Sequence, residues 1–399
     1  MNLLSSKKGR IILFASLYLS EGAPIGFIWW ALPTKLRMVN YPVDEITTLT
    51  SLLLIPWTVK FLWSPVIDSF RTPFWSLKSW IITFQALMGV TLLPLTLVPF
   101  ESSLPFLIPL LLLHAFFAAS QDAAIDALAI AHVPAEERGA INGWMQGGML
   151  VGRSLFGGGA ILAASLHQDW ALIAALIVII WFSSLLLVFS KEPAAHLTDA
   201  RTIQKFLLQL KKAANNSATW WGLLFAATSG AAFESVGAVA SPFLLDHGFK
   251  SGIIGYFFSF PAVAGMGFGA IIGGALADNI GHAQAVKIFL ISISMIVILL
   301  GFVAFAGDAE LLLYILLAIL YIAIGLFTAS SYSLLMGITD SKLGATQFSA
   351  YMAMTNVCEM WAGFTVGRLV VAYDYPFAFI VMGLVSLCTL LIVRKLHPR

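Results

Sequence analysis

Long apolar blocks, separated by short polar turns, constrain this chain more than any other feature. The blocks do not alternate polar and apolar residues, which excludes the strands of a membrane barrel, and they are long enough to cross a bilayer as helices. Only 11% of the 399 residues are charged, whereas soluble domains carry roughly 25%. We therefore expect an all-α membrane protein.

The polar turns divide the chain into twelve predicted transmembrane helices. Their ranges are 10–32, 46–67, 80–100, 103–131, 140–166, 169–190, 218–245, 251–276, 284–306, 309–336, 344–372 and 375–394. The longest link lies between the sixth and seventh helices. The predicted domains are therefore an N-terminal six-helix bundle at 1–190, a cytoplasmic linker at 191–217 and a C-terminal six-helix bundle at 218–399.

The two sets of six helices have features of a weak duplication. Asp68 closes the second predicted helix and Asp278 closes the eighth, and Glu21 in the first helix has a near counterpart in Glu234 of the seventh. Parallel six-helix repeats with a solute site at their interface are an architecture of secondary transporters. This pattern favours two pseudo-repeats.

The basic residues in the turns predict the orientation of the chain. Only Lys35, Arg37 and Lys250 fall in turns on one side of the membrane, and sixteen basic residues fall on the other side. The remaining three of the 22, Lys60, Arg153 and Arg368, lie inside predicted helices. Because basic turns stay in the cytoplasm, both termini are predicted to be cytoplasmic. The net charge of +2 is too small to indicate a nucleic-acid partner. We expect a monomer in a lipid bilayer.

Ionisable residues inside the apolar blocks are the candidate functional groups. Asp122 and Asp126 lie one helical turn apart in the fourth predicted helix, and Arg153 lies well inside the fifth. A charged group at the bilayer centre costs about 2.5–3.5 kcal/mol on insertion scales. We therefore expect the chain to use these groups in a water-accessible cavity.

One motif near the middle of the chain resembles a signature of the major facilitator superfamily. The stretch Gly274-x-x-x-Asp278-x-x-Gly281 is similar to the cytoplasmic loop motif that follows the eighth helix in that family. The corresponding stretch of the first half, residues 64–71, is degenerate because it lacks the glycines. The resemblance implies the major facilitator fold.

Further motifs in the first five predicted helices resemble one branch of the superfamily. They include Glu21-Gly22-Ala23-Pro24, the stretch PWTVKFLWSP at 56–65, and Ser120-Gln121-Asp122-x-x-x-Asp126. The branch holds the AmpG muropeptide permeases, the RhtX and FptX siderophore importers and the acetyl-CoA transporters. The second half of the chain matches only the superfamily, so the resemblance leaves the solute open.

The resemblance implies a secondary active transporter that works by alternating access. Twelve helices fit the siderophore importers better than AmpG, which typically has extra helices. We therefore expect proton-coupled import of a bulky polar solute, first a ferric siderophore, across a bacterial inner membrane, with the proton as coupling ion and no other cofactor. The alternatives are a permease for a muropeptide or an acetyl-CoA-like solute, an exporter, and a lipid flippase.

The candidate site residues fall into three groups. The predicted proton-coupling acids are Glu21, Asp122 and Glu234, because an apolar surrounding favours the neutral form of a carboxyl. The predicted solute-binding residues are Trp29, Trp30, His114, Arg153, Glu359 and Trp361. The predicted gating residues are Asp68, Arg71, Asp126, Arg138 and Asp278.

Several of these residues also fit a structural role. Arg153 either binds an anionic group, as its guanidinium suits carboxylate and phosphate, or pairs internally with Asp122 or Glu21. Lys60 either joins the polar cavity or extends to the cytoplasmic face. His114 is either a proton relay or a hydrogen-bonded interior histidine. The tryptophans either stack on a solute or pack between helices.

Two further patterns bear on function. The spacing Asp122-x-x-x-Asp126 is faintly similar to the metal-binding acids of intramembrane prenyltransferases, but these enzymes need a second acidic cluster, which the isolated Glu234 and Glu359 do not supply. We therefore expect no enzyme and no metal site. The glycine runs 157–159 and 265–269 lie inside helices and predict close helix contacts.

Overall fold

The computed structural model describes residues 2–69, 72, 75–97, 104–134, 137–164, 169–192, 211, 215–307, 309–339 and 344–396. Within these ranges the chain is all-helical, apart from one isolated bridge between Thr72 and Trp75. Nine stretches of the described chain are long and apolar enough to cross a membrane. The prediction of an all-α membrane protein is confirmed. Twelve helices and an internal repeat remain predictions.

The helices gather into two compact units. Unit 1 comprises Met1–Val39, Val59–Thr198 and Ser251–Ser259, and unit 2 comprises Asn40–Thr58, Asp199–Lys250 and Phe260–Arg399. Unit 1 thus includes one short segment that follows the predicted linker, Ser251–Ser259, and unit 2 includes one that precedes it, Asn40–Thr58. Most of that linker, including the whole of 193–210, lies outside the described residues.

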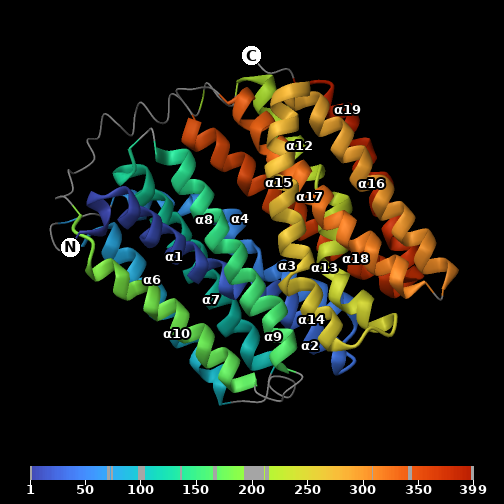
Figure 1. The fold of residues 1–399 in the computed structure, drawn as a ribbon, viewed down its shortest axis with the longest axis horizontal. Coiled ribbons are helices and arrows are strands. Elements are labelled where there is room, and N and C mark those ends of the chain that lie inside the picture. The colour runs from blue at the N-terminus through green and yellow to red at the C-terminus, as the bar shows by residue number, and fades with distance from the viewer. Residues whose placement is uncertain are drawn as a thin grey trace. The chain divides into compact units, whose positions relative to one another are not determined.

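Unit 1 is a bundle of long helices with short helical pieces at their ends (Figure 1). Its elements are η1 (Leu3–Ser5), α1 (Lys7–Gly26), η2 (Phe27–Ala31), α2 (Leu32–Met38), η3 (Lys60–Leu62), α5 (Ser64–Ser69), α6 (Leu77–Leu92), η4 (Leu93–Thr96), α7 (Leu104–His132), α8 (Arg138–Arg153), η6 (Ser154–Gly158), α9 (Gly159–Ala164), α10 (Asp169–Val188) and α14 (Ser251–Ser259). Leu13 and Leu17 of α1 pack with Ile125 and Leu128 of α7 in its buried core.

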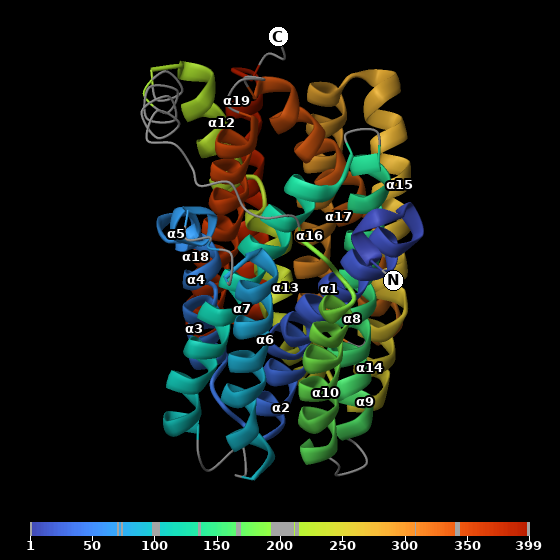
Figure 2. The same ribbon diagram turned by 90° about the vertical axis from the view of Figure 1, so that its left-hand side faces the viewer.

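Helices α1 and α8 pack tightly along a seam of glycines. Gly22 of α1 lies against the backbone of Met149, and a Cβ atom at this position would clash with the Met149 carbonyl oxygen. Gly148 and Gly152 of α8 lie equally close to the backbone of α1. Small residues four positions apart let two helix backbones approach in this way. The two ribbons run side by side in Figures 1 and 2.

Both partners of this seam continue into a π-helical turn. The turns are η2 after α1 and η6 after α8, and a π turn of this kind is rare in helices. Gly157 of η6 lies against the indole of Trp30 in η2, and Gly158 lies against the backbone of Ser259 in α14. The sequence prediction that residues 157–159 allow close helix contacts is confirmed for these two glycines. Helix α14 lies beside α9 in both views (Figures 1 and 2).

Unit 2 contains the remaining helices. They are α3 (Val43–Leu53), α4 (Ile55–Val59), which ends at the boundary with unit 1, α12 (Ser217–Thr228), α13 (Ala231–Asp246), α15 (Pro261–Ile280), α16 (His282–Ala306), α17 (Glu310–Ile338), α18 (Gly344–Cys388) and α19 (Leu390–Val393). A second glycine seam joins α15 to α17, where Gly269 and Gly273 lie against the backbone of Ile322 and Leu326. The predicted close contact at 265–269 is thus confirmed, although Gly267 has open space beside it.

Helix α18 holds two features that shape unit 2. Asp374 has left-handed backbone angles (φ 75°, ψ 167°), so the helix is interrupted there, between the predicted helices 344–372 and 375–394. The Asp374 carboxylate accepts a hydrogen bond from the amide of Tyr375 at 2.8 Å. Further toward its start, Gly367 lets α3 approach closely, because a Cβ atom there would clash with Thr47.

Candidate functional site

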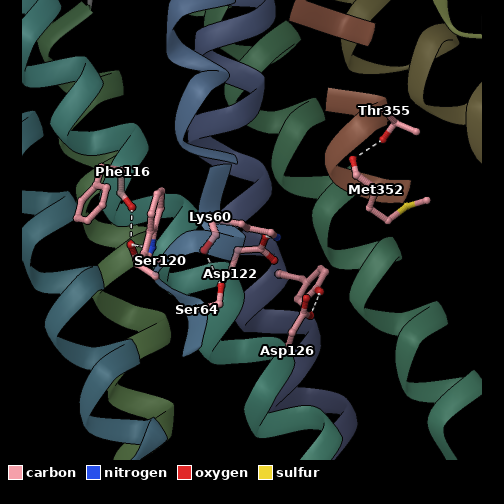
Figure 3. A network of polar contacts seen from close by, with 10 residues as sticks. Lys60, Ser64, Phe116, Ser120, Asp122, Asp126, Met352 and Thr355 are labelled. Atoms are coloured by element: carbon pink, nitrogen blue, oxygen red, sulfur yellow. Dashed lines mark hydrogen bonds and ion pairs between the residues drawn. The ribbon is translucent and has the colours of Figure 1, made fainter. Parts of the chain in front are cut away.

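An ion pair between Lys60 and Asp122 lies inside unit 1 (Figure 3). Asp122 is on α7 and only 7% exposed, and Lys60 is on η3, where the chain changes from α4 to a tighter turn. The hydroxyl of Ser64 donates to the Lys60 carbonyl at 2.8 Å and closes this turn. Breaks in the regular helix therefore bring the ammonium group to the carboxylate.

A second carboxylate lies one turn further along α7. Asp126 accepts a hydrogen bond of 2.6 Å from the hydroxyl of Tyr18 on α1. In Figure 3 the side chains of Asp122 and Asp126 follow one another along the same side of their helix. This arrangement confirms the sequence expectation that the two acids share a face. Asp126 thus links α7 to α1.

Glu21 is the third acid of this cluster and differs from the other two in its contacts. It lies on α1, is 2% exposed, and its Oε2 atom has no hydrogen-bond partner among the described residues. The carboxylates of Asp122 and Asp126 and the cations of Lys60 and Arg153 all lie within electrostatic range of it. We call these five side chains the charged cluster.

Arg153 ends α8 at the point where the glycine seam meets the π turn. Its backbone packs against Gly26, which leaves no space for a Cβ atom there. Its Nε atom is buried without a hydrogen-bond partner in the described part of the chain. The sequence left open an internal pair of Arg153 with Asp122, but Asp122 takes Lys60 as its partner.

The charged cluster does not balance its own charge. Three carboxylates face two cations, so the cluster carries a net negative charge unless one carboxyl holds a proton. An uncompensated charge away from water is costly. Asp122 has the Lys60 ammonium and Asp126 has the Tyr18 hydroxyl, whereas Glu21 keeps an unpartnered oxygen. The geometry therefore favours Glu21 as the position of that proton.

Three further polar side chains are buried in α6 and α7. Only Gln85 has both of its amide atoms hydrogen-bonded, whereas the Nε2 atom of His114 has no hydrogen-bond partner among the described residues. Gln85 of α6 donates to Ser20 at 3.1 Å and to Ser183 at 2.7 Å, and its carbonyl oxygen accepts from Ser184. His114 of α7 places Nδ1 3.1 Å from the carbonyl oxygen of Met88 and 3.2 Å from the Thr91 hydroxyl. This is the hydrogen-bonded interior histidine that the sequence left open, and solute binding by His114 remains a prediction.

Gln121 is the third of these side chains, and its amide has no partner. It is fully buried on α7, and neither its oxygen nor its nitrogen has a hydrogen-bond partner among the residues that the structure describes. Leaving a buried polar group unsatisfied costs about 1–3 kcal/mol. Sequence reasoning quoted Gln121 only as part of a motif.

The predicted site residues of the second half lie in unit 2. Glu234 of α13 and Glu359 of α18 are half-buried, and both lie within electrostatic range of the thiol of Cys358. The indole of Trp361 donates to the Ala227 carbonyl at 2.8 Å. Helices α13 and α18 thus place two carboxyl groups within electrostatic range of one buried thiol.

The predicted aromatic ligands of unit 1 differ from one another in burial. Trp30 is buried and stacks on Phe258 of α14, with 5.0 Å between the ring centroids. This contact is the packing role that the sequence left open for it. Trp29 is half-buried on η2. Solute stacking by either residue remains a prediction.

The predicted gating residues are only partly described. Asp278 is exposed and lies 4.0 Å from His282, one turn further along the chain, and Asp126 is held by Tyr18. Arg71 and the side chains of Asp68 and Arg138 lie outside the described residues.

Sequence reasoning did not predict two ion pairs near the ends of helices. Arg10 of α1 binds Glu137 at 2.7 Å and donates to the Leu4 carbonyl, and Arg368 of α18 lies 3.8 Å from Asp44 of α3. The partners in each pair are more than a hundred residues apart. Charge spacing along the chain carries no signal for such pairs.

The described residues contain no group of three or more His, Cys, Asp or Glu side chains that could hold a metal ion. Two carboxylates of the charged cluster have a partner within the protein, since Asp122 pairs with Lys60 and Asp126 accepts from Tyr18.

Comparison with known proteins places this geometry in context. Residues 11–367 match the family model described as Major Facilitator Superfamily. The chain is 22% identical over 405 residues to a Rickettsia conorii protein whose name includes "transporter AmpG 4", with 98% of each chain covered. It is also 25% identical over 387 residues to the anhydromuropeptide permease of Escherichia coli, covering 92% of this chain and 75% of the relative.

Solved structures of similar fold are also transporters. A D-xylose-proton symporter superposes with a TM-score of 0.79 at 12% sequence identity, covering 97% of both chains. The nucleoside transporter NupG gives a TM-score of 0.71 at 14% identity, covering 97% of this chain and 99% of that chain. At these identities the similarity establishes the fold alone.

Proposed function

This chain belongs to the Major Facilitator Superfamily. From that premise we propose that it imports a muropeptide-type solute across a bacterial inner membrane, driven by a proton gradient. The chain is a multi-pass membrane protein of a transporter family. The solute, the direction and the coupling ion are the proposal.

The relatives support a muropeptide-type solute. One of them is named for anhydromuropeptide transport and others carry the AmpG name. They favour the alternative reading of the sequence over the ferric siderophore, which we expected first because twelve helices fit that branch better. A count of predicted helices is thus a weaker guide to the solute than similarity over almost the whole chain.

Proton coupling is supported by one observation above all, the unpartnered carboxyl oxygen of Glu21 inside a cluster with one excess negative charge. A proton that binds Glu21 neutralises the cluster, and its release restores the charge. Asp122 pairs directly with Lys60, so we assign the proton exchange to Glu21. Arg153 lies within electrostatic range of Glu21 and stabilises its ionised form.

One proton per solute supplies enough energy for uphill uptake. Moving one elementary charge across about 100 mV yields about 2.3 kcal/mol, which corresponds to roughly fiftyfold accumulation of a neutral solute. A single exchangeable carboxyl is therefore sufficient. We propose that the carboxyl of Glu21 binds the proton in one conformation and releases it in the other.

The test is uptake of radiolabelled anhydromuropeptide by proteoliposomes, with and without a pH gradient that is acidic outside. Wild-type protein should accumulate the solute only with the gradient. Glu21→Gln should abolish accumulation and retain exchange of labelled for unlabelled solute, because the amide imitates the protonated acid. Glu310→Gln, an exposed acid at the start of α17, is the matched control.

Three outcomes would overturn parts of the proposal. Uphill uptake by Glu21→Gln would remove the proton assignment. Accumulation of a labelled ferric siderophore but not of anhydromuropeptide would reverse the choice of solute. Loss of solute on acidification outside would reverse the direction of transport.

A further inference from the structure

Two buried glutamines of unit 1 have the same side chain and the same complete burial but opposite hydrogen bonding. Gln85 on α6 has its amide bound by three serines, Ser20, Ser183 and Ser184. Gln121 on α7 has no hydrogen-bond partner at either amide atom among the described residues. Gln85 is therefore a structural crosslink between helices. Gln121 offers a donor and an acceptor that the described chain does not use.

The helices direct Gln121 toward the place where α1, α6 and α7 meet. Gln121 lies seven positions after His114, which is two helical turns, so both side chains lie on one face of α7. That face is turned to α6, because His114 Nδ1 lies 3.1 Å from the Met88 carbonyl oxygen of α6.

Glu21 is directed toward the same junction from α1. Its neighbour Ser20 binds Gln85 of α6 at 3.1 Å, and Tyr18, three positions earlier, binds Asp126 of α7 at 2.6 Å. The side chain of Glu21 leaves α1 between these two directions. Its unpartnered Oε2 and the unpartnered amide of Gln121 thus approach one three-helix junction from two sides.

We propose that Gln121 and Glu21 together bind an ordered water molecule at the junction of α1, α6 and α7. Both side chains are almost completely buried, so the site suits a small ligand. Water suits it chemically, since it needs two or more polar partners in a buried site and offers both donors and acceptors.

The water serves Glu21 in both of its protonation states, and this role rests on the proposed function. When Glu21 is ionised, the water donates one hydrogen to Oε2 and accepts one from the Gln121 amide nitrogen. When Glu21 is protonated, the carboxyl donates to the water oxygen, and the water donates to the Gln121 amide oxygen. A glutamine satisfies both arrangements because its amide carries a donor and an acceptor.

The experiment compares Gln121→Leu with the matched variant Gln85→Leu in the full chain. A density map that resolves ordered waters should show a water within hydrogen-bond distance of Gln121 in the wild-type protein and none in Gln121→Leu. The thermal midpoint should change little for Gln121→Leu, because the substitution breaks no hydrogen bond between described residues. It should fall for Gln85→Leu, which breaks the bonds to three serines.

Transport assays test whether the water assists Glu21, because a water with a structural role only would not affect the rate of uptake. Gln121→Leu should slow gradient-driven uptake of anhydromuropeptide about tenfold, the effect of one buried hydrogen bond, and leave exchange unchanged. Density in which a protein group binds the Gln121 amide directly would overturn the water site, whatever the solute proves to be. Unchanged gradient-driven uptake by Gln121→Leu would overturn its role for Glu21.

Discussion

The interiors of the two units differ in charge although they share a packing device. Unit 1 holds three acids and two cations within electrostatic range of one another, and two of the acids, Glu21 and Asp122, are buried. The described interior of unit 2 is joined mainly by neutral groups, such as the amide of Gln347, which donates to Thr219 at 2.9 Å and to Tyr351 at 2.8 Å. Each unit nevertheless has a glycine seam between two helices. Close helix packing therefore does not explain the charges.

The difference suggests that the two units have different functions in transport. A fold that needs only tight packing can be built without a charged cluster, so the cost of placing these ionisable groups inside unit 1 calls for a functional reason. We infer that energy coupling resides in unit 1. On this inference Glu234, which the sequence predicted as a proton-coupling acid, instead contributes to solute recognition together with Glu359. The predictions below test this comparison.

The largest expected effect is the loss of uphill transport in Glu21→Gln but not in Glu234→Gln. Removing the exchangeable carboxyl of unit 1 should reduce gradient-driven accumulation to the level without a gradient, roughly a fiftyfold loss at about 100 mV. Glu234→Gln should accumulate the solute to the same ratio with a raised KM. The measurement is the steady-state accumulation ratio in proteoliposomes.

Equal loss of accumulation in both variants would break the comparison, since energy coupling would then involve both units. Retained accumulation in Glu21→Gln with loss in Glu234→Gln would reverse it. Exchange of labelled for unlabelled solute verifies that each variant is folded and binds.

The next effect concerns the ion pairs of the two units. Lys60→Met leaves Asp122 buried without its cation and should lower the free energy of unfolding by about 3–5 kcal/mol. Arg368→Met removes the partner of Asp44 from a pair whose arginine side chain is 60% exposed, so it should cost about 0–1 kcal/mol. Unfolding of the purified protein in detergent provides the measurement.

A double variant tells whether the cost comes from an isolated charge. Lys60→Met combined with Asp122→Leu should recover most of the lost stability, because an apolar pair replaces a buried ion pair at little cost. If the double variant is less stable than Lys60→Met alone, the pair does not act through charge compensation.

The glycine seams should respond alike in the two units. Gly152→Ala in unit 1 and Gly269→Ala in unit 2 each force a Cβ atom into a neighbouring backbone, which should cost about 1–3 kcal/mol of unfolding free energy. Gly267→Ala, on the same helix as Gly269 but with open space beside it, should be neutral or stabilising by about 0.5–1 kcal/mol. Destabilisation by Gly267→Ala to the same extent would show that helix flexibility, not contact, is responsible.

The smallest effect separates stability from transport. Tyr18→Phe and Tyr375→Phe each remove a hydroxyl that donates to an aspartate, Asp126 at 2.6 Å and Asp246 at 2.7 Å. Each should cost about 0.5–1.5 kcal/mol of unfolding free energy. Only Tyr18→Phe should also slow gradient-driven uptake, because its bond belongs to the charged cluster. Slower uptake in both variants would assign proton coupling to both units.

The sequence predicted the helical membrane fold and the family because both depend on features that are continuous along the chain. Long apolar blocks fix the helices, and the stretch from Gly274 to Gly281 carries the family signature. The interruption at Asp374 falls between two predicted helices because the apolar pattern weakens there.

The partners within the site could not be predicted in the same way. The pairs Lys60–Asp122 and Tyr18–Asp126 join residues that are 62 and 108 positions apart, and the pattern gives each residue a helix but not the direction of its side chain. Arg153 was therefore assigned to Asp122 as one alternative, although Lys60 takes that place. Gln121 carried no signal, since an uncharged amide in an apolar block has no feature that distinguishes it from the bonded Gln85.

Helix α14 belongs to unit 1 although it is made well after the rest of that unit. At about 5–20 residues per second, the ribosome needs roughly 3–10 s to pass from residue 198 to residue 251. During this interval the close-packed face around Gly158, which receives Ser259 in the finished protein, has no permanent covering. Unit 1 is therefore completed only after residues 199–250 of unit 2 have been synthesised.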